Sequence, residues 1–338
     1  MNPEYRRDIR ILFGDANSGM RQLYRQALSG AGFTGLREFD SLAGFSDLLA
    51  VSRPDLLLLD AAMPGGDACA ALRAMRHGRL GNNPFLPAIL TTWEASQNMV
   101  RAAVDSGADD LLVKPLNTRT LIERIEALAT ARKPFVVTAD YIGPDRRKSI
   151  DRGGSEIPLI EAPNILRAKL LGEPVDAAQN QQALAAAQEQ VQSLRLRQSA
   201  FRIAFVAQQV VPAYRKGMVE QATRALLTDL IESVEEIARR VADTELAHIG
   251  KICDPLLLTA RHIAAGSLLL GATAEGRKQL DLLQTLSEAV LAFFNPGKQA
   301  NALAQEVALA VERYRARMAA RTAAAAAAAA SPDEAPPG

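Results

Sequence analysis

Residues 54–64 read PDLLLLDAAMP, and this stretch decides the fold of the N-terminal part of the chain. Its four consecutive leucines form a short apolar run, which is typical of a strand that is buried on both faces. The run ends at Asp60, so a carboxylate stands at the carboxyl end of the predicted strand. Open α/β sheets place their ligand chemistry outside these strand ends.

Residues 8–131 continue this alternation of short apolar runs and helical patterns. Five strands are predicted, each followed by a helix, at residues 9–13, 35–39, 56–59, 87–91 and 111–113. The pattern predicts a doubly wound α/β domain with a five-stranded parallel sheet. Because right-handed crossovers gather the strand ends at one edge, Asp15, Asp60, Thr92 and Lys114 are expected to meet there.

Composition favours a cytoplasmic protein made of ordinary globular domains. The chain has 338 residues, 48% hydrophobic and 23% charged, with a net charge of +1, so no global field favours DNA or an acidic membrane. The most apolar run, Pro255 to Ala274, is interrupted by Arg261 and His262, so no membrane insertion is expected. The N-terminus lacks the apolar core of a signal peptide. Cys69 and Cys253 form no CxxC pair and are expected to be reduced thiols.

Residues 132–175 are rich in proline and glycine and are predicted to be a linker. Within it, residues 141–147 read YIGPDRR. One interpretation is a docking turn, in which Tyr141 and Ile142 pack against a domain. The other is an anion or partner site made by Arg146, Arg147 and Lys148. We favour the docking turn.

Residues 176–322 are predicted to form an all-α domain, and residues 323–338 a disordered tail beyond a frayed helix end. Residues recur at steps of three and four, as a heptad seam, with polar Gln198 in the place between the fourth and fifth of the apolar residues Leu184, Ala187, Val191, Leu194, Phe201 and Phe205. The seam fits either the interior of a helical bundle or a homodimeric coiled coil. The helices mix acids with bases and show no compact helix-turn-helix signature, so DNA binding is not expected.

Four motifs give the N-terminal domain a family resemblance. They are ILFGDANSGMR at 11–21, DLLLLDAAMPGGD at 55–67, PAILTTW at 87–93 and GADDLLVKP at 107–115. In this order and spacing they resemble the receiver domain of two-component response regulators, a flavodoxin-like fold similar to the chemotaxis regulators. The resemblance covers about 40% of the chain.

The resemblance implies phosphoryl transfer from a histidine kinase, or from a phosphotransfer protein, to Asp60 as nucleophile. It implies Mg²⁺ held by Asp15, Asp60 and the backbone carbonyl of Ala62, with Lys114 and Thr92 binding phosphoryl oxygens. It also implies a cis peptide bond between Lys114 and Pro115. The protein would be a signalling response regulator rather than a conventional enzyme. Its helical region would pass the signal to an unknown protein target.

Two departures from the family pattern support a second hypothesis. Ala16 stands where the family usually carries a second acid, which should weaken Mg²⁺ binding. Leu111 stands where the family usually carries an aromatic that couples phosphorylation to the opposite surface. The alternative is a pseudo-receiver that serves as a scaffold and is not phosphorylated.

A third hypothesis is a phosphorelay in which His248 accepts the phosphoryl group from Asp60. His248 and Lys251 reproduce the His-x-x-Lys spacing of a histidine phosphotransfer helix, but Ile252 replaces the glycine that usually follows. A lone histidine on a helix is more often structural, so this hypothesis ranks third.

Overall fold

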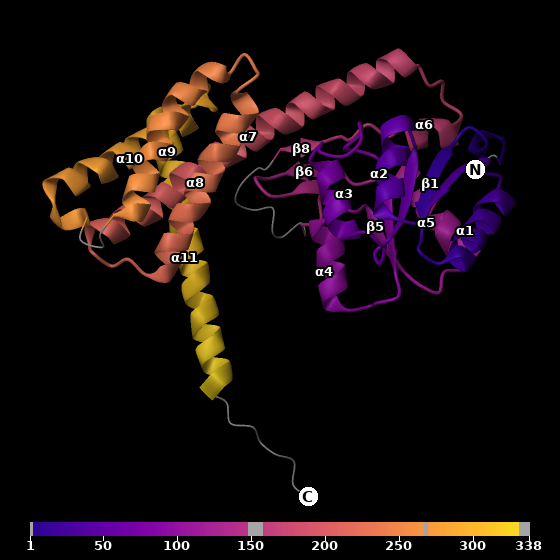
Figure 1. Cartoon of the computed structure of the whole chain (residues 1–338), viewed down its shortest axis with the longest axis horizontal. Coiled ribbons are helices and arrows are strands. Elements are labelled where there is room, and N and C mark those ends of the chain that lie inside the picture. The colour runs from indigo at the N-terminus through magenta and orange to yellow at the C-terminus, as the bar shows by residue number, and fades with distance from the viewer. Residues whose placement is uncertain (1–2, 148–157, 267–269, 331–338) are drawn as a thin grey trace, which may run out of the picture. The chain divides into compact units, whose positions relative to one another are not determined.

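A computed structural model of the chain describes residues 3–147, 158–266 and 270–330. The chain divides into two compact units, Met1–Leu194 and Arg195–Gly338. Figure 1 shows the sheet-containing unit in indigo to magenta and the helical unit in rose to yellow. No helix in the described part of the chain combines the length and apolar character needed to cross a membrane.

The N-terminal unit is built on the predicted five-stranded sheet. Its strands are β1 (Arg10–Gly14), β2 (Gly35–Phe39), β3 (Leu56–Asp60), β4 (Ala88–Thr92) and β5 (Asp110–Val113). All neighbouring strands are parallel, in the order β2-β1-β3-β4-β5. The α/β prediction is therefore confirmed. All five residues of β3 are buried, as its leucine run indicated.

Helices cover both faces of the sheet. α1 (Ser18–Gly30) and α5 (Thr118–Thr130) pack against one face, and α2 (Leu42–Val51), α3 (Ala68–Arg76) and α4 (Gln97–Asp105) against the other. A short 3₁₀ turn, η1 (Pro3–Arg6), precedes β1. Each of the five helices begins at a polar cap whose side chain accepts a backbone N–H, from Asn17, Ser41, Asp67, Ser96 and Asn117 in turn.

The segment that we predicted to be a linker, residues 132–175, contains regular structure. It carries β6 (Phe135–Val137), β7 (Ile142–Pro144), β8 (Leu159–Ile160) and α6 (Ile165–Leu171). The strands form an antiparallel sheet in the order β7-β6-β8. Its buried side chains cluster with Phe85 and with the first part of α7 (Ala177–Arg215). The apolar residues between the prolines and glycines thus bury a core of their own.

The YIGPDRR motif contributes to this small sheet. Ile142 is buried in β7, and the Tyr141 hydroxyl donates to the Pro144 carbonyl at 2.9 Å. Arg146 donates to the Ala108 carbonyl at 2.6 Å, and Arg147 pairs with Asp145 at 2.9 Å. These contacts agree with the docking interpretation. Lys148 lies outside the described residues.

A buried charge cluster lies beneath the small sheet. Arg76 is 1% exposed and donates to the carbonyls of Pro84, Leu86 and Gly107 and to the Asp109 carboxylate. Arg132 pairs with the same carboxylate at 2.7 Å. The two guanidinium groups lie 5.2 Å and 4.9 Å from the centre of the Phe135 ring. The Phe135 ring thus covers a charge cluster in which Arg76 and Arg132 share the Asp109 carboxylate.

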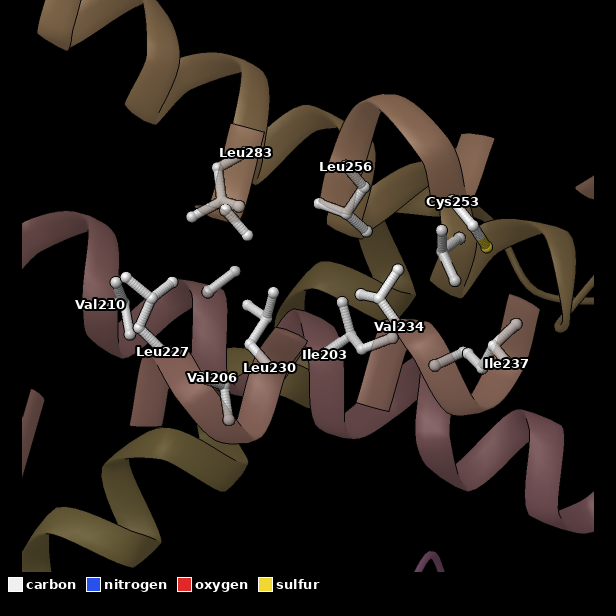
Figure 2. Close-up of a cluster of buried hydrophobic side chains, with 14 of the residues drawn as sticks. Ile203, Val206, Val210, Leu227, Leu230, Val234, Ile237, Cys253, Leu256 and Leu283 are labelled. Atoms are coloured by element: carbon white, nitrogen blue, oxygen red, sulfur yellow. The ribbon is translucent and has the colours of Figure 1, made fainter. Parts of the chain in front are cut away.

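The C-terminal unit is entirely helical in the residues described. It consists of the end of α7, then α8 (Gln221–Val241), η3 (Ala247–Ile249), α9 (Gly250–Ala265), η4 (Leu270–Ala272), α10 (Ala274–Phe293) and α11 (Ala300–Ala330). Figure 2 shows its core, where Ile203 and Val206 of α7 meet Leu230 and Val234 of α8 beneath Leu256 of α9. The helical prediction is confirmed.

The heptad seam is buried by the chain itself. Leu184, Ala187, Val191 and Leu194 belong to the cluster around β6–β8 in the first unit. Phe201 and Phe205, in the second unit, pack against a cluster formed with α10 and α11. The seam therefore serves two separate intrachain cores.

Residues 323–330 of the predicted tail are helical. α11 continues through the alanine run to Ala330, because alanine has the highest intrinsic helix propensity. The remaining residues of the tail prediction, 331–338, lie outside the described residues.

Candidate functional site

The predicted site residues meet at the carboxyl ends of four neighbouring strands. Asp15 follows β1, Asp60 ends β3, and Thr92 ends β4, while Lys114 follows β5. The strand register places Asp60 beside Thr91, and Thr92 beside Val113. β1 and β3 are adjacent, although the chain passes through β2 between them, so the site lies at the switch point of the sheet.

Lys114 joins the two carboxylates. Its Nζ lies 2.5 Å from Asp15 Oδ2 and 2.9 Å from Asp60 Oδ1. Asp15, Asp60 and Lys114 are between 1% and 4% exposed, so the three charges interact with little solvent screening. The peptide bond between Lys114 and Pro115 is cis, which confirms the expectation from the family resemblance.

Each carboxylate has a distinct set of partners. Asp15 Oδ1 accepts the Asn17 backbone N–H at 2.9 Å, which leaves Asp15 bonded through both oxygens. Asp60 Oδ1 is buried and accepts no hydrogen bond from the described residues, although the Lys114 ammonium pairs with it. Asp60 is therefore held in place by charge and retains capacity to accept a further partner.

Thr92 and Trp93 border the carboxylates. The Thr92 hydroxyl accepts the Glu94 backbone N–H at 3.0 Å, so the turn after β4 fixes it. The Trp93 ring is 60% exposed, and Lys114 Nζ lies 5.6 Å from its centre. The only tryptophan of the chain is thus a neighbour of the site and can report on it.

Two further residues near the site were not singled out from the sequence. Arg21 of α1 donates to the backbone carbonyls of Asp15 at 2.8 Å and Ala16 at 3.1 Å, and it braces the loop that carries the first carboxylate. The Tyr24 hydroxyl donates to Thr91 Oγ1 at 3.3 Å, and burial raises the pKa of Tyr24. Both lie on an amphipathic helix whose pattern gives no sign of contacts with the neighbouring strands.

The donor set fits a magnesium ion that relies on few protein ligands. No group of three or more His, Cys, Asp or Glu side chains in the described residues could hold a metal. The candidate ligands are Asp15, the unsaturated Asp60 carboxylate and the Ala62 carbonyl in the turn after β3. Mg²⁺ is commonly bound by one or two carboxylates with waters and phosphates completing its shell.

His248 does not share the helical setting of a phosphotransfer histidine. It lies in the short 3₁₀ turn η3 before α9, where its Nδ1 lies 3.1 Å from the Glu245 carbonyl oxygen. Its ring packs against Phe293, with 5.3 Å between the ring centres. His248 is exposed, and these contacts hold it in a turn rather than within a continuous helix.

Comparison with known proteins agrees with this geometry. A family model described as the response regulator receiver domain matches residues 11–126. Response regulator MprA of Mycobacterium avium is 33% identical over 173 residues, which cover 49% of this chain and 74% of that protein. The chain belongs to the response regulator family. Among response regulators, MprA of Mycobacterium tuberculosis is also similar, at 34% identity over 126 residues, 37% of this chain and 53% of the relative.

The match to response regulators is confined to the N-terminal part. This chain spans about half the length of the first curated relatives that it matches, 53% in the case above. Among solved structures, the chemotaxis response regulator CheY4 of Vibrio cholerae is 23% identical, covering 36% of this chain and 98% of that one, with a TM-score of 0.33. A CheY-like receiver from Methanospirillum hungatei is 24% identical, covering 35% and 90%, with a TM-score of 0.32.

Proposed function

We propose that this response regulator accepts a phosphoryl group on Asp60 from a histidine kinase or a histidine phosphotransfer protein. The observation that carries the proposal is the Lys114 ammonium, which bridges two buried carboxylates at the switch point of the sheet. An oxygen of Asp60 attacks phosphorus, a new O–P bond forms, and the N–P bond to the donor imidazole breaks. The imidazole leaves with the bonding electron pair and takes up a proton.

The surrounding groups assist this transfer through charge and hydrogen bonding. Lys114 can shift from the Asp60 carboxylate to an oxygen of the arriving phosphoryl group, because its other partner, Asp15, keeps it in place. The Thr92 hydroxyl can donate to a second oxygen while it accepts from Glu94. Mg²⁺, when held by Asp15, Asp60 and Ala62, would neutralise charge on the phosphoryl oxygens.

The proposal extends to the whole chain. The receiver domain would be residues 8–131, and the helical domain of residues 176–322 would pass the signal on through protein contacts. We place the protein in the cytoplasm, where histidine kinases present their phosphohistidine.

The test is phosphorylation of the purified chain by acetyl phosphate with Mg²⁺, read by intact-protein mass spectrometry. We expect one added phosphoryl group, which hydroxylamine removes because it is an acyl phosphate. Asp60→Asn should take up none. Asp105→Asn, an exposed acid at the end of α4, is the matched control and should behave as the parent.

A scaffold that is never phosphorylated is the second candidate, and Ala16 is the observation that favours it. If the parent chain stays unmodified at saturating Mg²⁺ and acetyl phosphate, the scaffold is supported. Equal modification of the parent and Asp60→Asn would refute Asp60 as the acceptor. Either result would also remove the basis for a relay through His248.

Restoring the missing acid should strengthen magnesium binding. In Ala16→Asp we expect Mg²⁺ to bind about tenfold or more tightly, because a third carboxylate joins Asp15 and Asp60. Titration of Trp93 fluorescence with Mg²⁺ measures the dissociation constant. Ala16→Asn, which adds a neutral oxygen of similar size, is the matched control and should gain less. Identical constants for all three proteins would show that residue 16 does not face the ion.

A further inference from the structure

Two adjoining cavities lie in the N-terminal unit, at the end of the sheet away from Asp60. The larger holds about 660 Å³ and the smaller about 530 Å³. Both are lined by Arg10 at the amino end of β1 and by Ser52, Arg53 and Pro54, which lead into β3. A strand of five residues separates them from the site, a distance of about 17 Å. The larger volume is in the range of cavities that hold small molecules.

The smaller cavity is strongly basic. Arg10, Arg37 and Arg53 line it, and no acidic residue does. Arg10 is 3.6 Å from the Asp55 carboxylate, but neither Arg37 nor Arg53 forms an ion pair in the part of the chain that the structure describes. Unpaired guanidinium groups around a hollow are suited to a phosphate, because their donors bind its oxygens in pairs.

The larger cavity combines an apolar wall with a rim of amides. The wall is built from the sheet unit and the start of α7, by Leu49, Met75, Leu86, Ile165 and Leu184. The rim carries amide side chains, Asn82, Asn83, Asn180, Gln181 and Gln188. Each amide carries both a donor and an acceptor, and Asn83, Asn180 and Gln188 already use one of them in a hydrogen bond within the chain. An apolar lining beside such amides fits a heteroaromatic ring with polar edges.

Asp55 supplies a buried acceptor in the lining of the larger cavity. Its side chain is 1% exposed, and its Oδ2 accepts the Arg10 backbone N–H and the Lys169 ammonium, each at 2.7 Å. Its Oδ1 is buried and accepts no hydrogen bond from the described residues. A buried carboxylate oxygen without a hydrogen-bond donor raises the free energy of the folded state, so this atom favours a ligand that donates an N–H.

We propose that these adjoining cavities bind a nucleotide. The phosphate would lie between Arg37 and Arg53 in the smaller cavity, and the base would lie against the apolar wall of the larger one. A ring N–H or amino group of the base would donate to Asp55. The proposal does not depend on phosphorylation of Asp60, since no residue of that site lines either cavity.

The test is calorimetric titration of the full chain with AMP, GMP, CMP and UMP, and with inorganic phosphate. We expect saturable binding of at least one nucleotide with a Kd below about 1 mM, and weaker binding of phosphate. The double variant Arg37→Gln/Arg53→Gln should bind at least about tenfold more weakly. Arg101→Gln, an exposed arginine of α4 that lines neither cavity, is its control.

A second pair of variants tests the larger cavity without changing the charge of the protein. Ala185→Trp places an indole in it, and its exposed neighbour Ala186→Trp places the same ring outside. We expect Ala185→Trp to lose binding and Ala186→Trp to keep it, with both retaining the parent circular dichroism spectrum.

The proposal is overturned by a parent chain that binds no nucleotide at millimolar concentration. It is also overturned if inorganic phosphate binds as tightly as every nucleotide. The same holds if Ala185→Trp and the double arginine variant both bind nucleotide as tightly as the parent does.

Discussion

Arg76→Met should lower the free energy of unfolding of the N-terminal unit by about 3–5 kcal/mol. Arg76 is a fully buried cation that donates to three backbone carbonyls and to Asp109. Methionine fills much of the space but leaves those acceptors without donors. Burial lowers the pKa of Arg76 to about 10, so the side chain stays charged at neutral pH. Denaturant unfolding followed by Trp93 fluorescence measures the effect in this unit alone, since no other tryptophan exists.

The control for Arg76 is an exposed arginine, which separates the effect of removing a buried charge from that of removing a charge at the surface. Arg119→Gln removes an arginine of an ion pair whose side chain is 88% exposed, and should leave the free energy of unfolding close to that of the parent. Burial would raise the pKa of Asp109, but Arg132 and Arg76 together hold it below its ordinary value. The stability that Asp109 contributes is therefore present above about pH 4 and is lost as the pH falls through its folded pKa. The difference in the free energy of unfolding between the parent and Asp109→Asn should therefore become smaller in acid. Equal stability of the parent and Arg76→Met would contradict the structural role of the cluster.

Leu230→Ala should destabilise the helical unit by about 2–5 kcal/mol. Leu230 of α8 is fully buried among α7, α9 and α10, and its truncation leaves a cavity in that core. Leu258→Ala on α9 is the matched control, because Leu258 is 58% exposed and should contribute less than about 0.5 kcal/mol. Far-ultraviolet circular dichroism measures the loss of helix in both units during denaturant unfolding, and Trp93 fluorescence identifies the transition of the N-terminal unit. Comparable losses in both variants would mean that α8 does not form the centre of this core.

Much of the receiver fold could be predicted because its signals are local. The leucine run before Asp60 is short, bounded and fully buried, and polar caps begin each surrounding helix. The site could be predicted because its residues follow strand ends, which the fold brings to one edge. Arg21 and Tyr24 could not, since their contacts depend on how α1 packs rather than on any spacing.

The segment after the receiver was harder to predict for a physical reason. β6, β7 and β8 contain only three, three and two residues, so alternation cannot be detected in them. Their partners lie far away in sequence, as with Phe85 and Phe135, whose rings lie 5.6 Å apart. Pro212 lies inside α7, which continues to Arg215, although proline usually ends or kinks a helix.

The charge cluster beneath the small sheet bears on where this receiver can be shortened. The match to the receiver family model ends at residue 126, but Arg132, Phe135 and Arg146 complete the surroundings of Asp109 beyond that limit. A fragment cut at residue 131 would keep every residue of the phosphoryl site. It would nevertheless expose Phe85 to water and leave Asp109 with one guanidinium instead of two. Slow folding or low solubility of such a fragment would therefore reflect the loss of the segment that covers Phe85 and Asp109, and would give no information about Asp60.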